Sequence, residues 1–365
     1  MRETETVADA RRAMDICNSC RYCEGFCAVF PAMELRRSFP AADLGYLANL
    51  CHNCRGCYYA CQYAPPHPFG LNLPRIFAEL RIETYEDRAW PPALGRVFRR
   101  NGLVVSLATA LLLALTLLLA AAVRGPVGAP GAFYDVLPKG LLVGLGGAAL
   151  LFALFALGKG AVNFWRVSGI AWRGKGRFVA PFAALADVAT LRNLGSPHGC
   201  NDRDESFSNL RRRFHHAMFY GFLACFAATA TATIYEYGLG LSAPYPVFSL
   251  PVLLGTVGGL GMLVGTAGLF WLKLTGDPAP GLRRLLGGEV ALLALLFAIA
   301  ASGLALLLWR ATAAMPALLA LHVGLVLAFF LLLPYSRMVH GIYRGLALLR
   351  WALERRLDSG DGQSG

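Results

Sequence analysis

Six long apolar stretches constrain the fold of this chain more than any other feature. Each is about as long as a helix that crosses the hydrocarbon core of a bilayer, which takes roughly 20 residues. Apolar residues make up 56% of the chain and charged residues only 15%, which predicts a six-span membrane protein with a small soluble part. The second stretch is rich in glycine, which predicts close contact with other helices rather than with lipid. The stretches are residues 103–123, 140–158, 214–237, 250–272, 290–309 and 314–335.

The connections between the stretches alternate in basic residues, and this alternation predicts their sides. Lysine and arginine precede the first stretch and fill the second-to-third connection, the fourth-to-fifth connection and the C-terminal tail. The other connections hold only Arg124, Lys139 and Arg310. By the positive-inside rule, both termini and the soluble part are cytoplasmic. The same bias explains the net charge of +12 without any binding of nucleic acid.

Two runs of four cysteines precede the membrane part and predict its chemistry. Both have the C-x2-C-x2-C-x3-C spacing by which bacterial ferredoxins hold [4Fe–4S] clusters. Thiolates are soft ligands that suit such clusters, and in two-cluster proteins the fourth cysteine of each run ligates the other cluster. We therefore assign Cys17, Cys20, Cys23 and Cys61 to one cluster, and Cys51, Cys54, Cys57 and Cys27 to the second.

Two other uses of the cysteines fit less well. A disulfide framework needs an oxidising compartment, which conflicts with the predicted cytoplasmic side. A zinc site needs four thiolates in paired knuckles, so the third cysteine and its partner would be surplus. Ferredoxin runs end in Cys-Pro, whereas Ala28 and Gln62 follow the last cysteines here. A looser or helical exit from each run is therefore predicted.

The soluble part has the pattern of helices. Apolar residues recur at Leu44, Leu47 and Leu50, which predicts a short helix over residues 42–50, and a further amphipathic helix lies near 74–84. The fold class is therefore all-α. Its predicted parts are a helical two-cluster ferredoxin-like domain at 1–100, a six-helix transmembrane haem b domain at 101–345 with a cytoplasmic loop at 159–213, and a cytoplasmic tail at 346–365.

Four histidines in or beside the apolar stretches predict a haem b site. His215 and His216 open the third stretch, while His322 and His340 lie on the sixth and just after it. Ionisable groups in membrane spans are costly and therefore usually functional. His322 and His340 are 18 residues apart, so on one continuous helix they would share a face about 27 Å apart.

His340 and the His215/His216 pair come from different helices at one depth, so a haem iron can be held between them. The other stretches offer no histidine at the depth of His322. We therefore expect one haem b with the axial ligands His215 and His340, and His216 and His322 as the alternatives. The competing interpretation is that His215 and His216 are ordinary interfacial residues and that His340 is a polar cap. Nearby arginines, including Arg211 and Arg344, could pair with the haem propionates.

The connection at residues 191–206 is dense in polar and turn residues. It predicts an ordered cytoplasmic loop that could dock a partner or shape a quinone site, although a solvated loop is the simpler interpretation. Its His198, Cys200 and Asp202 match no metal-ligand spacing. The sequence has no glycine-rich nucleotide motif and no hydrolase triad, so substrate chemistry is expected on another polypeptide.

Over nearly its whole length the chain resembles the tricarballylate/citrate-utilisation protein B family. The likeness lies in the cysteine region 17–61, in residues 198–202 (HGCND) and in residues 214–222 (FHHAMFYGF). The resemblance implies a membrane protein with two [4Fe–4S] clusters and a haem b. Such proteins reoxidise a partner FAD-dependent tricarballylate dehydrogenase and reduce the quinone pool. A fused relative serves cobalamin biosynthesis.

The last stretch is also similar to the final helix of the respiratory nitrate reductase gamma subunit, through residues 321–323 (LHV) and 333–340 (LPYSRMVH). Two histidines at this spacing bind two haems in that family, but the partner histidine at the outer depth is absent here. A heterodisulfide-reductase-like subunit is a rival interpretation, although only Cys200 and Cys225 remain for its extra cysteines. A transporter with a redox-sensing head would need interrupted spans or charges within the membrane.

Overall fold

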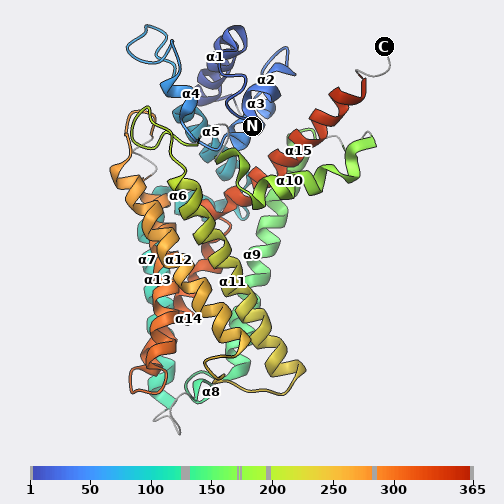
Figure 1. The fold of residues 1–365 in the computed structure, drawn as a ribbon. Coiled ribbons are helices and arrows are strands. Elements are labelled where there is room, and N and C mark those ends of the chain that lie inside the picture. Colours follow the sequence, from blue (N-terminus) through green and yellow to red (C-terminus); the bar gives the residue numbers. More distant parts are fainter. Residues whose placement is uncertain are drawn as a thin grey trace.

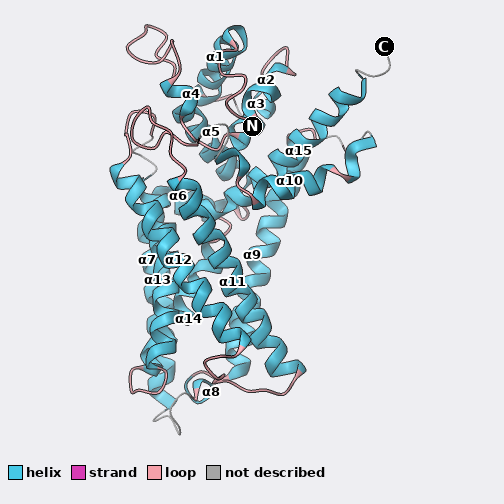
Figure 2. Ribbon diagram, in the orientation of Figure 1, coloured by secondary structure: helices cyan, strands magenta, loops and turns pink. Residues whose placement is uncertain are grey.

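The structure, a computed structural model, describes residues 3–124, 132–170, 172, 175–194, 199–281 and 286–361. Its regular elements within these ranges are helices, and the only β pairing there is an isolated bridge between Cys200 and Ser208. Figure 1 shows a bundle of long helices with a helical head at one end. Figure 2 shows loops joining helices throughout. The predicted all-α fold with a helical head is confirmed.

Six helices among the described residues are long and apolar enough to cross a membrane, and they match the predicted stretches one for one. The chain is therefore a multi-pass membrane protein. Half of the apolar window of α14 is buried, more than in any other span, because α14 packs against α7, α9 and α13. The spans are α7 (Gly102–Arg124), α9 (Lys139–Val167), α11 (Leu210–Gly238), α12 (Leu250–Thr275), α13 (Leu286–Trp309) and α14 (Met315–Leu332).

The head packs its helices around one apolar core. The helices predicted at 42–50 and 74–84 are present as α3 and α5. No helix was predicted at α1, because only its narrow face of Val7, Ala10, Ala13 and Met14 is buried and most of its other residues are polar. The head helices are α1 (Glu5–Cys20), α2 (Val29–Glu34), α3 (Ala41–Leu50), α4 (Gly56–Tyr59), α5 (Leu73–Arg88) and α6 (Pro92–Arg100).

Shorter elements and one long helix complete the chain. Near the ends of the spans lie α8 (Phe133–Val136), η1 (Lys175–Phe178), α10 (Ala180–Ala189), η2 (Arg192–Leu194) and η4 (Arg337–Val339). The last helix, α15 (His340–Asp361), runs across the head-side end of the bundle, close to α10 (Figure 1).

The sixth span ends before His340, so the prediction of one continuous helix through His322 and His340 is wrong. Pro334 has no amide hydrogen to donate to the carbonyl four residues earlier, which removes a helical hydrogen bond at this point. The carbonyl of Leu332 instead accepts hydrogen bonds from the amides of Tyr335 and Ser336, at 3.0 and 2.9 Å. The chain then turns, and His340 begins a helix with a different direction.

The segment predicted as a tail packs into the head. Ala347, Leu348 and Trp351 of α15 belong to the buried core that α1, α3 and α5 also form. Polar groups reinforce this contact, because Arg350 lies 2.6 Å from Asp43, and Glu354 accepts hydrogen bonds from Arg36 and Tyr46. Residues 346–361 therefore fix the head to the helix that carries His340.

The sequence had predicted close helix contact at the glycines of the second span, but the structure has it at glycines of α11, α12 and α14. A Cβ atom on Gly144, Gly146 or Gly147 of α9 would meet no atom within 4 Å. A Cβ atom on Gly265 of α12 would lie 2.4 Å from the amide nitrogen of Met218 on α11. The glycine-rich part of α9 faces open space, whereas α11 and α12 pack backbone to backbone.

This packing predicts a selective loss of stability. Gly265→Val should lower the free energy of unfolding by about 1–3 kcal/mol, because the new side chain must separate α11 from α12. Gly146→Val places the same side chain on α9, where it meets open space, and should leave the midpoint unchanged. Thermal unfolding in detergent, followed by intrinsic fluorescence, measures both. Equal midpoints for the two variants would contradict this account of the packing.

Candidate functional site

The first cysteine run is shaped by the end of α1. Arg21 adopts a left-handed conformation with φ of 56°, and its amide donates a hydrogen bond to the carbonyl of Cys17 at 2.8 Å. The helix therefore stops with Cys17 and Cys20 on its last turn, and Cys23 follows in the turns beyond it. The next helix, α2, starts at Val29, so the predicted helical exit after Cys27 is confirmed.

The second cysteine run uses the same backbone device. Asn53 and Arg55 have φ of 57° and 70°, and Arg55 is the residue that precedes α4. Among the described non-glycine residues, only Arg21 and Leu191 also have a positive φ. Left-handed backbone is costly for such residues and gathers at functional sites. Three of these four positions lie within the cysteine runs.

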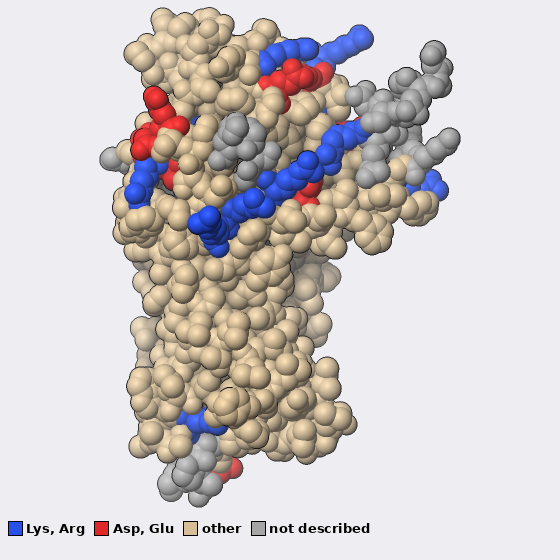
Figure 3. Space-filling model, viewed as in Figure 1, with Lys and Arg blue, Asp and Glu red and all other residues tan. Residues whose placement is uncertain are grey.

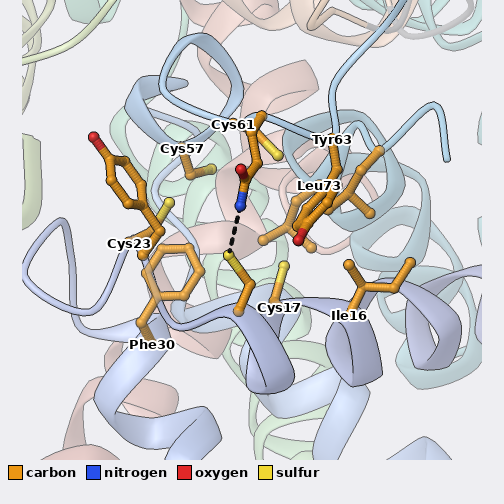
Figure 4. Close-up of a pocket in the computed structure, with 12 residues that line it drawn as sticks. Ile16, Cys17, Cys23, Phe30, Cys57, Cys61, Tyr63 and Leu73 are labelled. Atoms are coloured by element: carbon orange, nitrogen blue, oxygen red, sulfur yellow. Dashed lines mark hydrogen bonds between the residues drawn. The ribbon is translucent and has the colours of Figure 1, made fainter. Parts of the chain in front are cut away.

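Cys17, Cys20, Cys23 and Cys61 line one small pocket, and Cys57 of the second run lines it too. Figure 4 shows the labelled Cys17, Cys23 and Cys61 around a common space walled by apolar side chains. The walls include Ile16, Phe30, Tyr63 and Leu73. The side-chain amide of Gln62 donates a hydrogen bond to the sulfur of Cys20 at 3.6 Å. The structure thus places Cys61 with the first three cysteines of the other run.

The remaining four cysteines form a neighbouring group. Burial raises the pKa of the Cys27 and Cys57 thiols, and both lie close enough to Cys51 and Cys54, and to Cys23 of the first run, for these neighbours to raise it further. The amide of Asn53 donates a hydrogen bond to the sulfur of Cys51 at 3.4 Å. Cys27 therefore lies with the second run, as the exchanged assignment of the fourth cysteines requires.

Burial makes the free thiols of both groups hard to ionise. It raises the pKa of Cys17 and Cys23 to about 12, with neighbouring thiols adding to the effect. It also raises the pKa of Cys27 and Cys57 well above the ordinary value. Four buried thiolates repel one another unless a cation compensates their charge. Such sites become favourable when a cationic centre binds.

The number and surroundings of these cysteines are compatible with iron–sulfur clusters. Among the described residues, no three His, Cys, Asp or Glu side chains lie close enough to hold one metal ion. A [4Fe–4S] cluster binds its thiolates at four corners of a cube and so holds them further apart. Two groups of four cysteines in apolar surroundings, with N–H groups aimed at sulfur, match that requirement.

His215 and His340 meet at the head-side end of the spans. Their ring centroids lie 6.1 Å apart and the ring planes cross at 83°. An iron bound to two imidazoles at ~2 Å each would place the centroids ~6 Å apart. The Nδ1 of His340 lies 2.6 Å from the carbonyl oxygen of Arg337. When Nδ1–H donates a hydrogen bond to this carbonyl, the lone pair of Nε2 remains available to a metal, as in histidines that bind metals.

The surroundings keep His340 neutral and able to bind a metal. Burial lowers its pKa to about 3, and the nearby guanidinium of Arg344 adds to this shift. Among the described residues, the Nδ1 of His215 and the Nε2 of His216 are buried without a hydrogen-bond partner. Unpartnered imidazole nitrogens beside a second histidine fit an axial haem site. His216 packs on Tyr220, whereas His215 faces His340.

His322 lies away from this pair. It occupies α14 in the interior of the spans, where it lines a cavity with Phe222 and Met262. The structure therefore brings His215 and His340 together and does not bring His322 to them. His322 and His340 lie on separate helices, so they cannot act as the two ends of one ligand helix.

Two arginines connect the histidine pair to the second cysteine run. Arg344 follows His340 by four residues and donates a hydrogen bond to the carbonyl of Cys51 at 3.0 Å. Arg211 precedes His215 by four residues and donates one to the carbonyl of Asn53 at 2.6 Å. Residues four apart lie on one face of a helix. The sequence suggested these arginines as partners of haem propionates, and in the structure they donate hydrogen bonds to backbone carbonyls of the head.

The first part of the polar loop after residue 198, residues 200–202, belongs to this junction, whereas residues 203–207 are exposed. Cys200, Asn201 and Asp202 are all buried. The amide of Asn201 donates a hydrogen bond to the carbonyl of Cys54 at 2.9 Å, and Asp202 lies 2.5 Å from Arg211. His198 lies outside the described residues. The sequence pointed to this loop but not to the contacts of Asn201 and Asp202 with the head, because polar loop composition looks the same whether a loop is packed or solvated.

The basic residues gather at the level of this junction. Figure 3 shows Lys and Arg side chains along the boundary between head and spans on the visible face, with an uncharged belt beneath them. At the opposite end, Lys139 is paired with Glu236. On the head side, Glu289 at the start of α13 pairs with Lys273 and lies 3.4 Å from Arg337.

Comparison with known proteins matches both parts of the chain. The family model of citrate utilization protein B matches residues 96–361, and that of its Fer4-like domain matches residues 10–87. A citrate utilization protein B from Escherichia coli is 46% identical over 368 residues, which cover 99% of this chain and 96% of the relative. No solved structure matches the chain. One relative therefore matches both the head and the spans within a single chain.

The exchange of fourth cysteines can be tested by substitution. Cys61→Ser should alter the same EPR signal as Cys17→Ser, because the structure places Cys61 with the first run. Cys27→Ser should alter the signal that Cys54→Ser alters. Low-temperature EPR of the reduced protein measures all four variants. A Cys61→Ser spectrum that matches that of Cys54→Ser would contradict the exchange.

The histidine pair predicts which residues hold haem b. His340→Ala and His215→Ala should each abolish the haem b absorption band, because each removes one axial ligand. Both variants should keep their EPR signals from the clusters, which report an intact head.

His216→Ala serves as the matched neighbour and should retain the band. Loss of the band in His216→Ala, with retention in His215→Ala, would show that His216 is the axial ligand instead. An unchanged band in His340→Ala would contradict the axial assignment.

Proposed function

The chain belongs to the citrate utilization protein B family, and we propose that it carries electrons from a flavoprotein dehydrogenase to the membrane quinone pool. The partner is a dehydrogenase of tricarballylate or a related tricarboxylate, whose reduced FAD this chain reoxidises. Two [4Fe–4S] clusters and one haem b supply one-electron transfer when bound. The chain itself holds these groups in order and forms no substrate-oxidising site in this scheme.

The observation that carries this proposal is the hydrogen-bonded connection, through Arg344 and Arg211, between the second cysteine run and the helices that carry the histidine pair. Arg344 joins the backbone of Cys51 to the helix that begins at His340. Burial lowers the pKa of His52, the neighbour of Cys51, and the nearby guanidinium of Arg344 lowers it further. His340 is also close enough to His52 to contribute to this shift. Two redox sites that share hydrogen-bonded backbone are arranged for relay rather than for storage.

The first cysteine group is placed for a soluble partner. Tyr22, inside the first run, is 68% exposed, and Phe69 beside Tyr63 is 46% exposed. Exposed aromatic residues at a redox site favour docking of another protein. We place the reduced flavoprotein against this surface, which keeps the second cysteine group for the membrane side.

The basic junction supports a cytoplasmic head. Arg211, Lys273, Arg337 and Arg344 all lie at the head-side ends of the spans, while the far ends hold few basic residues. The positive-inside rule places such an end in the cytoplasm. A soluble dehydrogenase there and a quinone in the bilayer would meet opposite ends of one protein.

The relay can be tested in liposomes that contain the full protein and a menaquinone or ubiquinone. Photochemically reduced FAD should reduce the protein, and quinol should then accumulate. Cys17→Ser should block reduction by flavin, because the first cysteine group is broken. His340→Ala should accept electrons but form quinol no faster than liposomes without protein.

Cys200→Ser is the matched control, because Cys200 is buried outside both cysteine groups, and it should behave like the wild type. Stopped-flow absorbance follows protein reduction, and extraction with chromatography follows quinol. Quinol formation at the wild-type rate in His340→Ala would contradict the relay through the histidine pair.

A further inference from the structure

A cavity of about 300 Å³ lies among α11, α12, α13 and α14. On α12 its lining runs from Val252 to Met262, which is the half of that helix away from the head. The described lining residues are uncharged and mostly apolar, and His322 is the only imidazole among them. Ligand sites of this kind are largely apolar and contain a few well-placed polar groups.

His322 is held in place by two features of α13. Its Nδ1 lies 3.0 Å from the hydroxyl oxygen of Ser302, which also lies 3.1 Å from the carbonyl oxygen of Ile299. Gly303 makes room for the ring, because a Cβ there would lie 2.9 Å from Cε1 of His322. Nε2 has no hydrogen-bond partner among the described residues. The imidazole is thus anchored at one nitrogen and free at the other.

The two threonines that border the cavity do not offer comparable groups. The hydroxyl of Thr229 donates a hydrogen bond to the carbonyl of Cys225, and that of Thr256 donates one to the carbonyl of Val252. Both are used within their own helices, a common state of hydroxyls in apolar helices. His322 is therefore the polar group of the cavity with a free hydrogen-bonding position.

We propose that this cavity binds the ring of the membrane quinone, and that Nε2 of His322, an acceptor while Nδ1–H donates to Ser302, accepts a hydrogen bond from a hydroxyl of the quinol form. A quinone has a flat apolar ring, two acceptor oxygens and an isoprenoid tail that lies in lipid. The cavity offers an apolar space, one anchored imidazole and a lipid-facing side at Phe226, which is 49% exposed. This inference rests on the proposed function, because it names where the electron acceptor binds.

The cavity lies within reach of the histidine pair. Phe222 lines it and follows His215 by seven residues on α11, which is ~10 Å along the helix axis. The ring of Phe222 packs on that of Phe329, another lining residue, at 5.7 Å. Reduction of the quinone to quinol consumes two electrons, which the flavin of the partner supplies, and two protons, which water supplies.

A second haem is the competing occupant. It would need an axial ligand opposite His322, and the lining offers only the sulfur atoms of Met262 and Cys225 for this role. Haem content distinguishes the two occupants directly, because a quinone site adds no haem to the protein.

The test measures binding of 2-heptyl-4-hydroxyquinoline N-oxide, a fluorescent quinone analogue, to the full protein in detergent. His322→Ala and Ser302→Ala should weaken binding by about tenfold or more, since each removes or releases the hydrogen-bonding imidazole. Val326→Phe should weaken it as well, because it fills the cavity and leaves His322 in place. Thr266→Ala, a buried position on α12 outside the cavity, should bind like the wild type.

Haem content, cluster EPR and the rate at which a short-chain quinone reoxidises the reduced protein are measured on the same samples. Weaker analogue binding and slower reoxidation, with haem and clusters unchanged, support the proposal. A fall of haem content by half in His322→Ala would show a second haem and overturn it.

Unchanged binding in both His322→Ala and Val326→Phe would also overturn it, and would leave the relay to another quinone site. A wild-type protein that holds its clusters and haem but neither binds the analogue nor reduces quinone would overturn the proposed function together with this site.

Discussion

The arrangement of the whole site depends on two arginine side chains that bond to carbonyl oxygens of the second cysteine run. Arg211 and Arg344 each lie one helical turn from a histidine of the facing pair, and they reach Asn53 and Cys51. Hydrogen bonds from a charged donor are stronger than neutral ones, more so where water is excluded. The same side chains therefore set the distance between head and spans and the position of the histidines.

These contacts also create a difference in charge between the two cysteine groups. Arg81 and Arg344 both donate hydrogen bonds to the carbonyl of Cys51, and Arg211 lies close by. Net charge and hydrogen bonding tune the reduction potential of iron–sulfur sites. Guanidinium groups favour added negative charge at the second group, while the first lies beside the exposed Tyr22. A cluster held by the second group would therefore have a higher reduction potential than one held by the first.

The sequence predicted what depends on spacing and hydropathy, namely the spans, the helical head and the helix over residues 42–50. It failed where packing decides. Glycine content could not distinguish α9, where Gly146 faces open space, from α12, where Gly265 meets α11. The apolar pattern continued to residue 335, but Pro334 turned the chain and separated His322 from His340. The grouping of Cys61 with Cys17 followed from ferredoxin spacing, whereas the contact of Asn201 with Cys54 had no signal in composition.

His340 is fixed from two directions, and this explains why the turn at Pro334 matters. From the head, Arg344 ties its helix to Cys51. From the membrane, Glu289 of α13 lies 3.4 Å from Arg337, and the carbonyl of Arg337 lies 2.6 Å from Nδ1 of His340. A straight continuation of α14 would have lost both constraints. Because a metal-binding histidine depends on the partner of its second nitrogen, the turn gives His340 a fixed orientation that suits the proposed haem site.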